Sequence, residues 1–139
     1  MTNKKTPIKS IAIELTMFLA YAFFAVNWIA GSTLTPNILK AFNLEGANSV
    51  SLINNVVTIA KIVGNLVAAT IFAKLFPKKS IGLGALLIPA GALLAALSPT
   101  FPIFLIGRFV MGFGGALFVV YFSPVVVNYF DPDKRPVVN

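Results

Sequence analysis

The sequence contains no cysteine and no histidine among its 139 residues. Without thiolates and imidazoles, the usual zinc and iron sites and nucleophilic thiol chemistry are excluded. The run GFGG has the wrong spacing for a dinucleotide fingerprint, and neither a phosphate-binding loop nor a catalytic triad can be assembled. We therefore expect no enzyme, no metal site and no cofactor.

Acidic side chains are also scarce, with four Asp and Glu against eleven Lys and Arg and a formal net charge of +7. A basic balance of this size is found in many nucleic-acid-binding proteins. Here, however, the basic residues form neither one face nor one tail, so a nucleic-acid partner is not expected.

Apolar residues are abundant, at 58% of the chain, while charged residues make up 11%. A soluble domain of this size could not bury so much apolar surface. Four segments reach the roughly 17–25 residues that cross a hydrocarbon core: 11–35, 50–73, 81–98 and 101–129. The sequence therefore predicts an all-α integral membrane protein with four transmembrane helices and the lipid bilayer as its environment.

Polar separators divide these segments. A loop rich in Pro, Gly and Asn follows the first segment, a basic turn follows the second, and an uncharged turn with Pro99 and Pro102 follows the third. Residues 1–10 are expected to form the cytoplasmic N-terminus, and residues 130–139 a cytoplasmic polar tail or the link to a fifth helix. The first segment is too long for a signal-peptide core and is expected to be retained.

Basic residues are distributed unequally between the two sides of the predicted bundle. The side that carries both termini has eight basic residues, whereas the opposite side has only Lys40. By the positive-inside rule, both termini are then expected to be cytoplasmic. The protein is expected in the cell membrane as a multi-pass protein. The eight basic residues on the cytoplasmic side are Lys4, Lys5, Lys9, Lys74, Lys78, Lys79, Lys134 and Arg135.

Two basic residues, Lys61 and Arg108, fall within the apolar segments. Each costs roughly 2.5–3.5 kcal/mol near the bilayer centre, so a partner or a water-filled cavity is expected. Glu14 is the only carboxylate near the hydrocarbon, and it lies toward the cytoplasmic end of the first segment. Either an anionic ligand or an acid from elsewhere is expected to compensate these cations.

Polar side chains line one side of the second segment. At about 100° per residue, they fall within about 60° of one another and should face a cavity or another helix. Interhelical hydrogen bonding is the alternative, although a lysine favours the cavity. Asn27 of the first segment serves either as a ligand or as a packing residue, and Trp28 is interpreted as packing or as an anchor. The predicted substrate or ion pathway is Arg108, Lys61, Asn54, Thr58, Asn65 and Asn27.

Glycines crowd around Arg108 in the fourth segment. Gly112, Gly114 and Gly115 are small enough to let helices approach closely, and Gly84 and Gly91 repeat at heptad spacing in the third segment. We expect these glycines to serve helix packing.

The stretch GRFVMGFGGA is similar to the arginine-glycine motif of the major facilitator superfamily, with Arg108, Gly112 and Gly114 at the matching positions. The four segments together resemble the N-terminal third of such a transporter. Complete members have two six-helix halves built from three-helix repeats. The resemblance thus implies an incomplete half, and we expect a fragment, a truncated gene product or one piece of a split protein.

The basic turn is a second point of resemblance. It retains Lys74, Lys78 and Lys79, but Ala69 and Ala73 stand where the family has Gly and Asp. Phe76–Pro77 likewise replaces the family's second Gly. This departure implies a turn that acts mainly as a topological signal.

The resemblance implies a secondary transporter in which Arg108 and Lys61 line the central route. Two cations without a midplane acid then favour a small anionic solute. Two other functions stay open. The chain could be a self-contained four-helix transporter that works with a second copy, as in the small multidrug resistance family, although two cations would repel that family's cationic drugs. It could also be a non-transport accessory or scaffold subunit whose charges pair with a partner's acids.

Overall fold

A computed structural model describes residues 8–129, and within that range every regular element is a helix. The helices are α1 (Ile8–Thr33), α2 (Thr35–Ala41), α3 (Ala47–Ala96) and α4 (Phe101–Tyr129). Four stretches are long and apolar enough to cross a membrane: Ser10–Thr33, Ala47–Leu75, Lys79–Ala96 and Phe101–Val125. The prediction of an all-α membrane protein with four spans is confirmed for the described residues.

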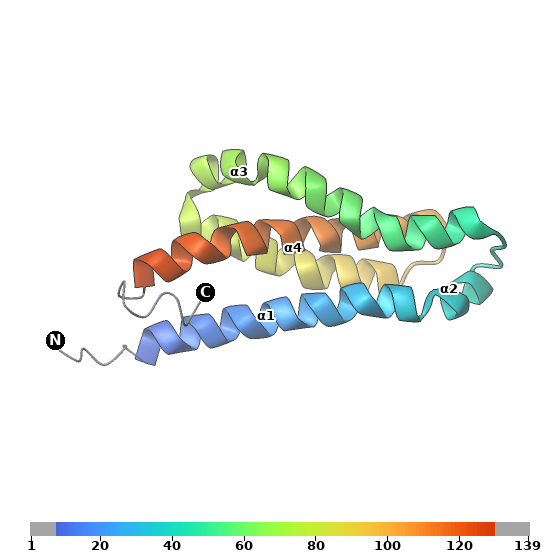
Figure 1. The fold of residues 1–139 in the computed structure, drawn as a ribbon, viewed down its shortest axis with the longest axis horizontal. Helices are drawn as coiled ribbons and strands as arrows, with labels where there is room; N and C mark the ends of the chain where they lie inside the picture. Colours follow the sequence, from blue (N-terminus) through green and yellow to red (C-terminus); the bar gives the residue numbers. More distant parts are fainter. Residues whose placement is uncertain (1–7, 130–139) are drawn as a thin grey trace, which may run out of the picture.

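Consecutive spans run in opposite directions along the bundle (Figure 1). The start of α1 and the end of α4 therefore lie at the same end of the bundle (Figure 1). This arrangement is the one expected if both ends of the chain lie on one side of the membrane. Assignment of that side to the cytoplasm stays a prediction from the charge pattern.

Element α3 contains the second and third spans, because it doubles back on itself (Figure 1). A straight helix of 50 residues would be about 75 Å long, more than twice the thickness of a hydrocarbon core. Pro77, which has no N–H to continue the helical ladder, falls at the reversal. We call Ala47–Leu75 the first limb of α3 and Lys79–Ala96 the second limb.

Helix α1 ends at Thr33, two residues before the predicted boundary, and the two-turn helix α2 replaces part of the expected loop. Pro36 accounts for the break, because it has no N–H to continue the hydrogen-bond ladder of α1 and stands instead in the first turn of α2, where a helix tolerates proline. Two hydroxyls cover carbonyls near this end: Thr33 donates to Ile29 O at 3.2 Å and Thr35 to Gly31 O at 2.9 Å.

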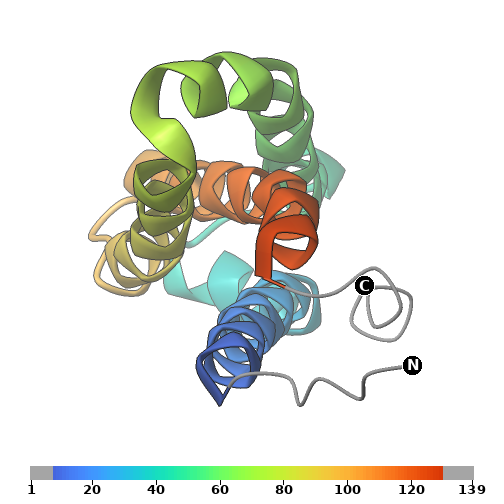
Figure 2. The same cartoon turned by 90° about the vertical axis from the view of Figure 1, so that its left-hand side faces the viewer.

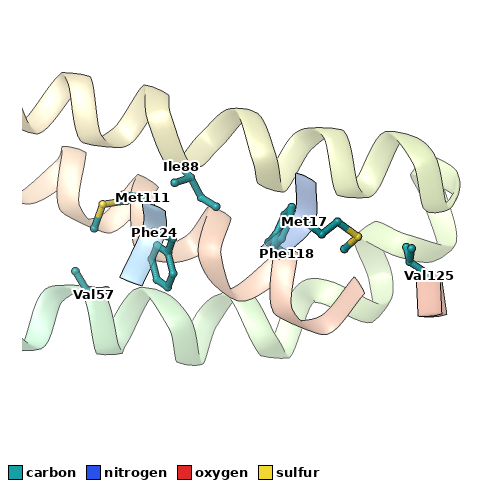
Figure 3. Packing of buried hydrophobic residues seen from close by; sticks show 7 residues of the cluster. All are labelled: Met17, Phe24, Val57, Ile88, Met111, Phe118 and Val125. Carbon is teal, nitrogen blue, oxygen red and sulfur yellow. The ribbon is translucent and has the colours of Figure 1, made fainter. Parts of the chain in front are cut away.

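Helix α4 lies at the centre of the bundle. In an apolar 18-residue stretch of its span, 56% of the residues are buried, against 17–22% in the corresponding stretches of the other three spans. In end view, α4 is surrounded by three neighbours, namely α1, the first limb of α3 and the second limb of α3 (Figure 2). Its buried residues Met111, Phe118 and Val125 recur every seven positions (Figure 3). They pack with Met17 and Phe24 of α1, which are also seven apart, and with both limbs of α3.

The second limb of α3 meets α4 at backbone distance. A Cβ on Gly91 would lie 2.7 Å from the Gly107 carbonyl oxygen, and one on Gly114 would lie 3.0 Å from that of Gly84. Gly84 and Gly91 are seven residues apart on the second limb, and Gly107 and Gly114 are seven residues apart on α4. This spacing is expected for two long helices in continuous contact. These glycines let α4 pack closely against the second limb.

Candidate functional site

Arg108 is only 5% exposed and points from α4 to α1. Its Nη1 donates to the main-chain oxygen of Asn27 at 2.7 Å, and its Nη2 donates to that of Trp28 at 3.2 Å. Hydrogen bonds from an ionised donor are stronger than neutral ones. Arg108 therefore connects α4 to α1 without any carboxylate, by way of two neutral carbonyls.

Gly31 leaves the space that the guanidinium fills. A Cβ at this position would overlap Nη1, Nη2 and Cζ of Arg108. Asn27 takes part through its backbone only, because its side-chain Nδ2 donates to Phe23 O of the same helix at 2.8 Å. The sequence predicted Asn27 as a ligand or as a packing residue, and the structure brings its main-chain carbonyl to Arg108.

Lys61 of the first limb contacts the ring of Trp28. Its Nζ is 3.9 Å from the centroid of the Trp28 ring, within the range of a cation–π contact. Trp28 thus meets both membrane cations, one through its ring and one through its carbonyl. From the sequence, Trp28 was predicted to pack or to anchor, and its contact with Lys61 was not predicted. One signal was present, since Trp28 directly follows Asn27 and precedes Gly31 by less than one turn.

No ion pair joins Lys61 or Arg108 to an acid within residues 8–129, where the only carboxylates are Glu14 and Glu45. Glu14 precedes Trp28 by fourteen residues, about 21 Å along a helix. Glu45 lies before the start of α3. The Nε of Arg108 is buried and has no hydrogen-bonding partner among the described residues. This part of the chain therefore carries an uncompensated positive charge.

The four polar residues predicted to share one side of the second segment, now the first limb, are Asn54, Thr58, Lys61 and Asn65. Only part of this set lies at the site. Lys61 and Asn54 are half-buried, whereas Thr58 and Asn65 are exposed on the described bundle. The Oδ1 of Asn54 is buried without a partner among residues 8–129. Of the four residues, Lys61 alone is brought to the Trp28–Arg108 contact.

The three glycines selected around Arg108 face three different neighbours. A Cβ on Gly112 would lie 3.0 Å from Val57 of the first limb, and one on Gly114 would lie 2.7 Å from Leu87 of the second limb. At Gly115 a Cβ would overlap the Phe24 ring of α1. These small residues let α4 contact all three of its neighbours within one turn.

The predicted cytoplasmic loop motif lies at the reversal of α3. Lys74 and Lys79 are exposed, and the Lys78 side chain lies outside the part of the chain that the structure describes. Close to this reversal, the buried Tyr121 of α4 donates its hydroxyl to Ala68 O at 3.0 Å. This bond attaches the end of the first limb to α4.

Two cavities lie elsewhere on the described bundle. One of about 440 Å³ lies at the α2 end, and one of about 340 Å³ lies between α1 and α4. Neither is lined by Lys61, Arg108 or Trp28. The first is lined by Leu34, Asn37, Ile38, Ala41, Phe42, Ala95, Ala96, Ser98, Pro99 and Phe104. The second is lined by Phe18, Tyr21, Phe118, Val119, Phe122 and Ser123.

Comparisons with known proteins cover almost the whole chain. Residues 16–139 match the family model described as Major Facilitator Superfamily. An uncharacterized protein of Campylobacter jejuni is 30% identical over 123 residues, which are 88% of this chain and 38% of that protein. An MFS-type transporter of Metarhizium majus is 30% identical over 135 residues, 96% of this chain and 23% of that protein. The chain thus spans less than half the length of these relatives. No solved structure matches at comparable significance.

Proposed function

Because the chain belongs to the major facilitator superfamily, a family of transporters, we propose that it forms part of a secondary transporter for a small anionic solute. The observation that carries the proposal is the pair of cations on Trp28, with no carboxylate beside them among residues 8–129. We place this transporter in the cell membrane and assign it no catalytic chemistry.

The anionic character of the solute follows from electrostatics. Opposite charges attract far more strongly in a low-dielectric site than in water, and unpaired charges are costly there. Lys61 Nζ contacts a neutral ring and Arg108 donates to neutral carbonyls, so neither charge is cancelled by a described residue. An arriving anion supplies the missing charge. Lys61 is the better contact for it, because Lys61 is half-buried and Arg108 almost fully buried.

Further protein is proposed to cover the polar side of the first limb. Thr58 and Asn65 are exposed on an apolar span, where contact with lipid is unfavourable for polar groups. The remaining helices of a full transporter, or a second copy of this chain, would shield them and complete the solute route. With these residues, Asn54 and the carbonyl of Asn27 are proposed as secondary contacts of the pathway.

Uptake by cells that carry variants in the native gene tests this function. Labelled acetate, succinate, phosphate and sulfate serve as solutes, with labelled choline as the cation. We expect deletion of the gene to abolish specific uptake of at least one anion and Lys61→Gln to lower it at least tenfold.

Lys40→Gln is the matched control, because Lys40 is exposed on α2 and distant from Trp28 in the described bundle. It should leave uptake unchanged. Uptake of choline that depends on the gene and is indifferent to Lys61→Gln would contradict the proposal.

A further inference from the structure

The contact between Lys61 and Trp28 suggests how the site is stabilised when it holds no solute. We propose that the Trp28 indole holds the Lys61 ammonium in the empty site and that the solute anion takes Lys61 from the ring. Trp28 is then a positioning residue that competes with the solute for Lys61. This inference rests on the proposed anion function and adds a specific role for one residue.

The Trp28 ring is the only described group that makes an attractive contact with the Lys61 ammonium. Its centroid lies 3.9 Å from Nζ, and both side chains are half-buried. The face of an indole carries a partial negative charge that attracts an ammonium ion. Without it, Lys61 would be an unpaired cation in an apolar span, which is costly. The ring therefore lowers the cost of an empty site.

The tryptophan is fixed, so the lysine is the partner that moves. The Trp28 carbonyl accepts a hydrogen bond from Arg108 Nη2 at 3.2 Å, and its ring stacks on Phe24 at a centroid distance of 6.1 Å. Phe24 is itself fully buried and lies against Gly115 of α4. Lysine, in contrast, carries its charge on a flexible four-carbon stem. Arg108 thus holds the main chain of Trp28, and the stack on Phe24 holds the ring that positions Lys61.

Exchange from the ring to the anion is favourable because a full negative charge attracts an ammonium more strongly than a ring quadrupole does. The ring contact is nevertheless lost when the anion binds, so it weakens the apparent affinity for the anion. Removal of the ring should therefore tighten anion binding. A ring that merely contacted the solute would have the opposite effect, because its removal would weaken binding.

Fluorescence reports this exchange directly, since Trp28 is the single tryptophan of the chain. The full chain in lipid nanodiscs is titrated with sodium acetate, succinate or phosphate, with ionic strength held constant by sodium chloride. At least one anion should give a saturable change in emission. Lys61→Gln should abolish the response and give, without anion, the emission of the anion-saturated protein. Lys40→Gln should respond as the unsubstituted chain does.

Calorimetric titration of the same anion into nanodiscs tests the competition. Trp28→Leu should lower Kd about tenfold, equivalent to about 1.4 kcal/mol. Trp28→Phe keeps an aromatic ring of weaker cation–π strength and should lower Kd about threefold. This second variant maintains the test if loss of the indole impairs folding.

The outcomes separate this inference from the function beneath it. Weaker anion binding in both Trp28 variants, or an emission response that persists in Lys61→Gln, would overturn the role of Trp28. If no anion changes the tryptophan emission while cells with Lys61→Gln lose uptake, the proposed role of Trp28 is wrong and the proposed anion transport is retained. If emission ignores every anion and uptake is also independent of Lys61, both fail.

Discussion

Arg108 shows how a permanent charge is accommodated in a membrane helix without an acid. Its burial in the span costs several kcal/mol, and each charge-assisted hydrogen bond returns about 1.5–3 kcal/mol. The two bonds to Asn27 O and Trp28 O are therefore of the right size to offset that cost. Backbone carbonyls of α1 serve as acceptors here because Gly31 lets the guanidinium lie directly on the helix.

Gly31→Ala should release this contact. The added Cβ overlaps the Arg108 guanidinium, so Arg108 must leave at least one carbonyl, at a cost on the order of 2–3 kcal/mol. Thermal unfolding in detergent, followed by helical circular dichroism, should show a lower midpoint. Gly82→Ala is the matched control, because nothing lies within 4 Å of a Cβ there. Equal midpoints for the two variants would refute the Arg108–α1 contact.

At the level of elements, the helices are held together in two different ways. The second limb of α3 packs on α4 through facing glycines, with backbone against backbone. Helix α1 is held instead by side chains, namely Phe24 against Gly115 and Arg108 against two carbonyls. Lipid is as apolar as the helices, so close packing and hydrogen bonds, rather than the hydrophobic effect, determine which helices associate.

Gly91→Ala should force α4 away from the second limb. Its Cβ would lie 2.7 Å from Gly107 O and closer still to the backbone of Met111, neither of which can move alone. Overpacking of this kind costs about 1–3 kcal/mol. We expect a lower unfolding midpoint than for Gly82→Ala in the same limb. A midpoint that rises, as the better helix propensity of alanine alone would produce, would argue against the glycine contact.

At the level of the whole molecule, the described helices make one bundle whose two described ends lie at the same end (Figure 1). The reversal of α3 lies at that end too, and the connection between α2 and α3 lies at the opposite end (Figure 1). Lys74 and Lys79, which flank the reversal, are exposed, and Glu45 belongs to the α2–α3 connection. By the positive-inside rule, we predict that the end with the lysines faces the cytoplasm.

Cysteine labelling tests this orientation, and the chain has no native cysteine to interfere. A membrane-impermeant maleimide should label Glu45→Cys in intact cells. It should label Lys79→Cys only in inside-out vesicles or permeabilised cells. The reverse pattern would show that the bundle is inserted in the opposite orientation, and labelling of both variants in intact cells would show insertion in both orientations.

Much of the architecture was readable in advance. The four spans, the absence of strands from the described residues and the family were each predicted. Reversal of the chain between the second and third spans was predicted as well, and both spans belong to the single element α3. The N-terminal boundary of the loop region was misplaced by two residues, because the pattern of apolar residues does not register that Pro36 lacks the N–H needed to continue the α1 ladder.

The sequence by itself determined the fold class and the number of spans, because a hydrocarbon core demands helices of a certain length whatever their partners. It also indicated that Lys61 and Arg108 are cations within apolar spans and that the glycines permit close packing, since charge and size are properties of single residues. Only the tertiary structure decided that Trp28 contacts both cations. A helix that is apolar on nearly every side does not encode which face it turns to its neighbours. The rotation of α1 against α4 and the first limb is set by packing, and that rotation alone brings Trp28 to Lys61 and Arg108.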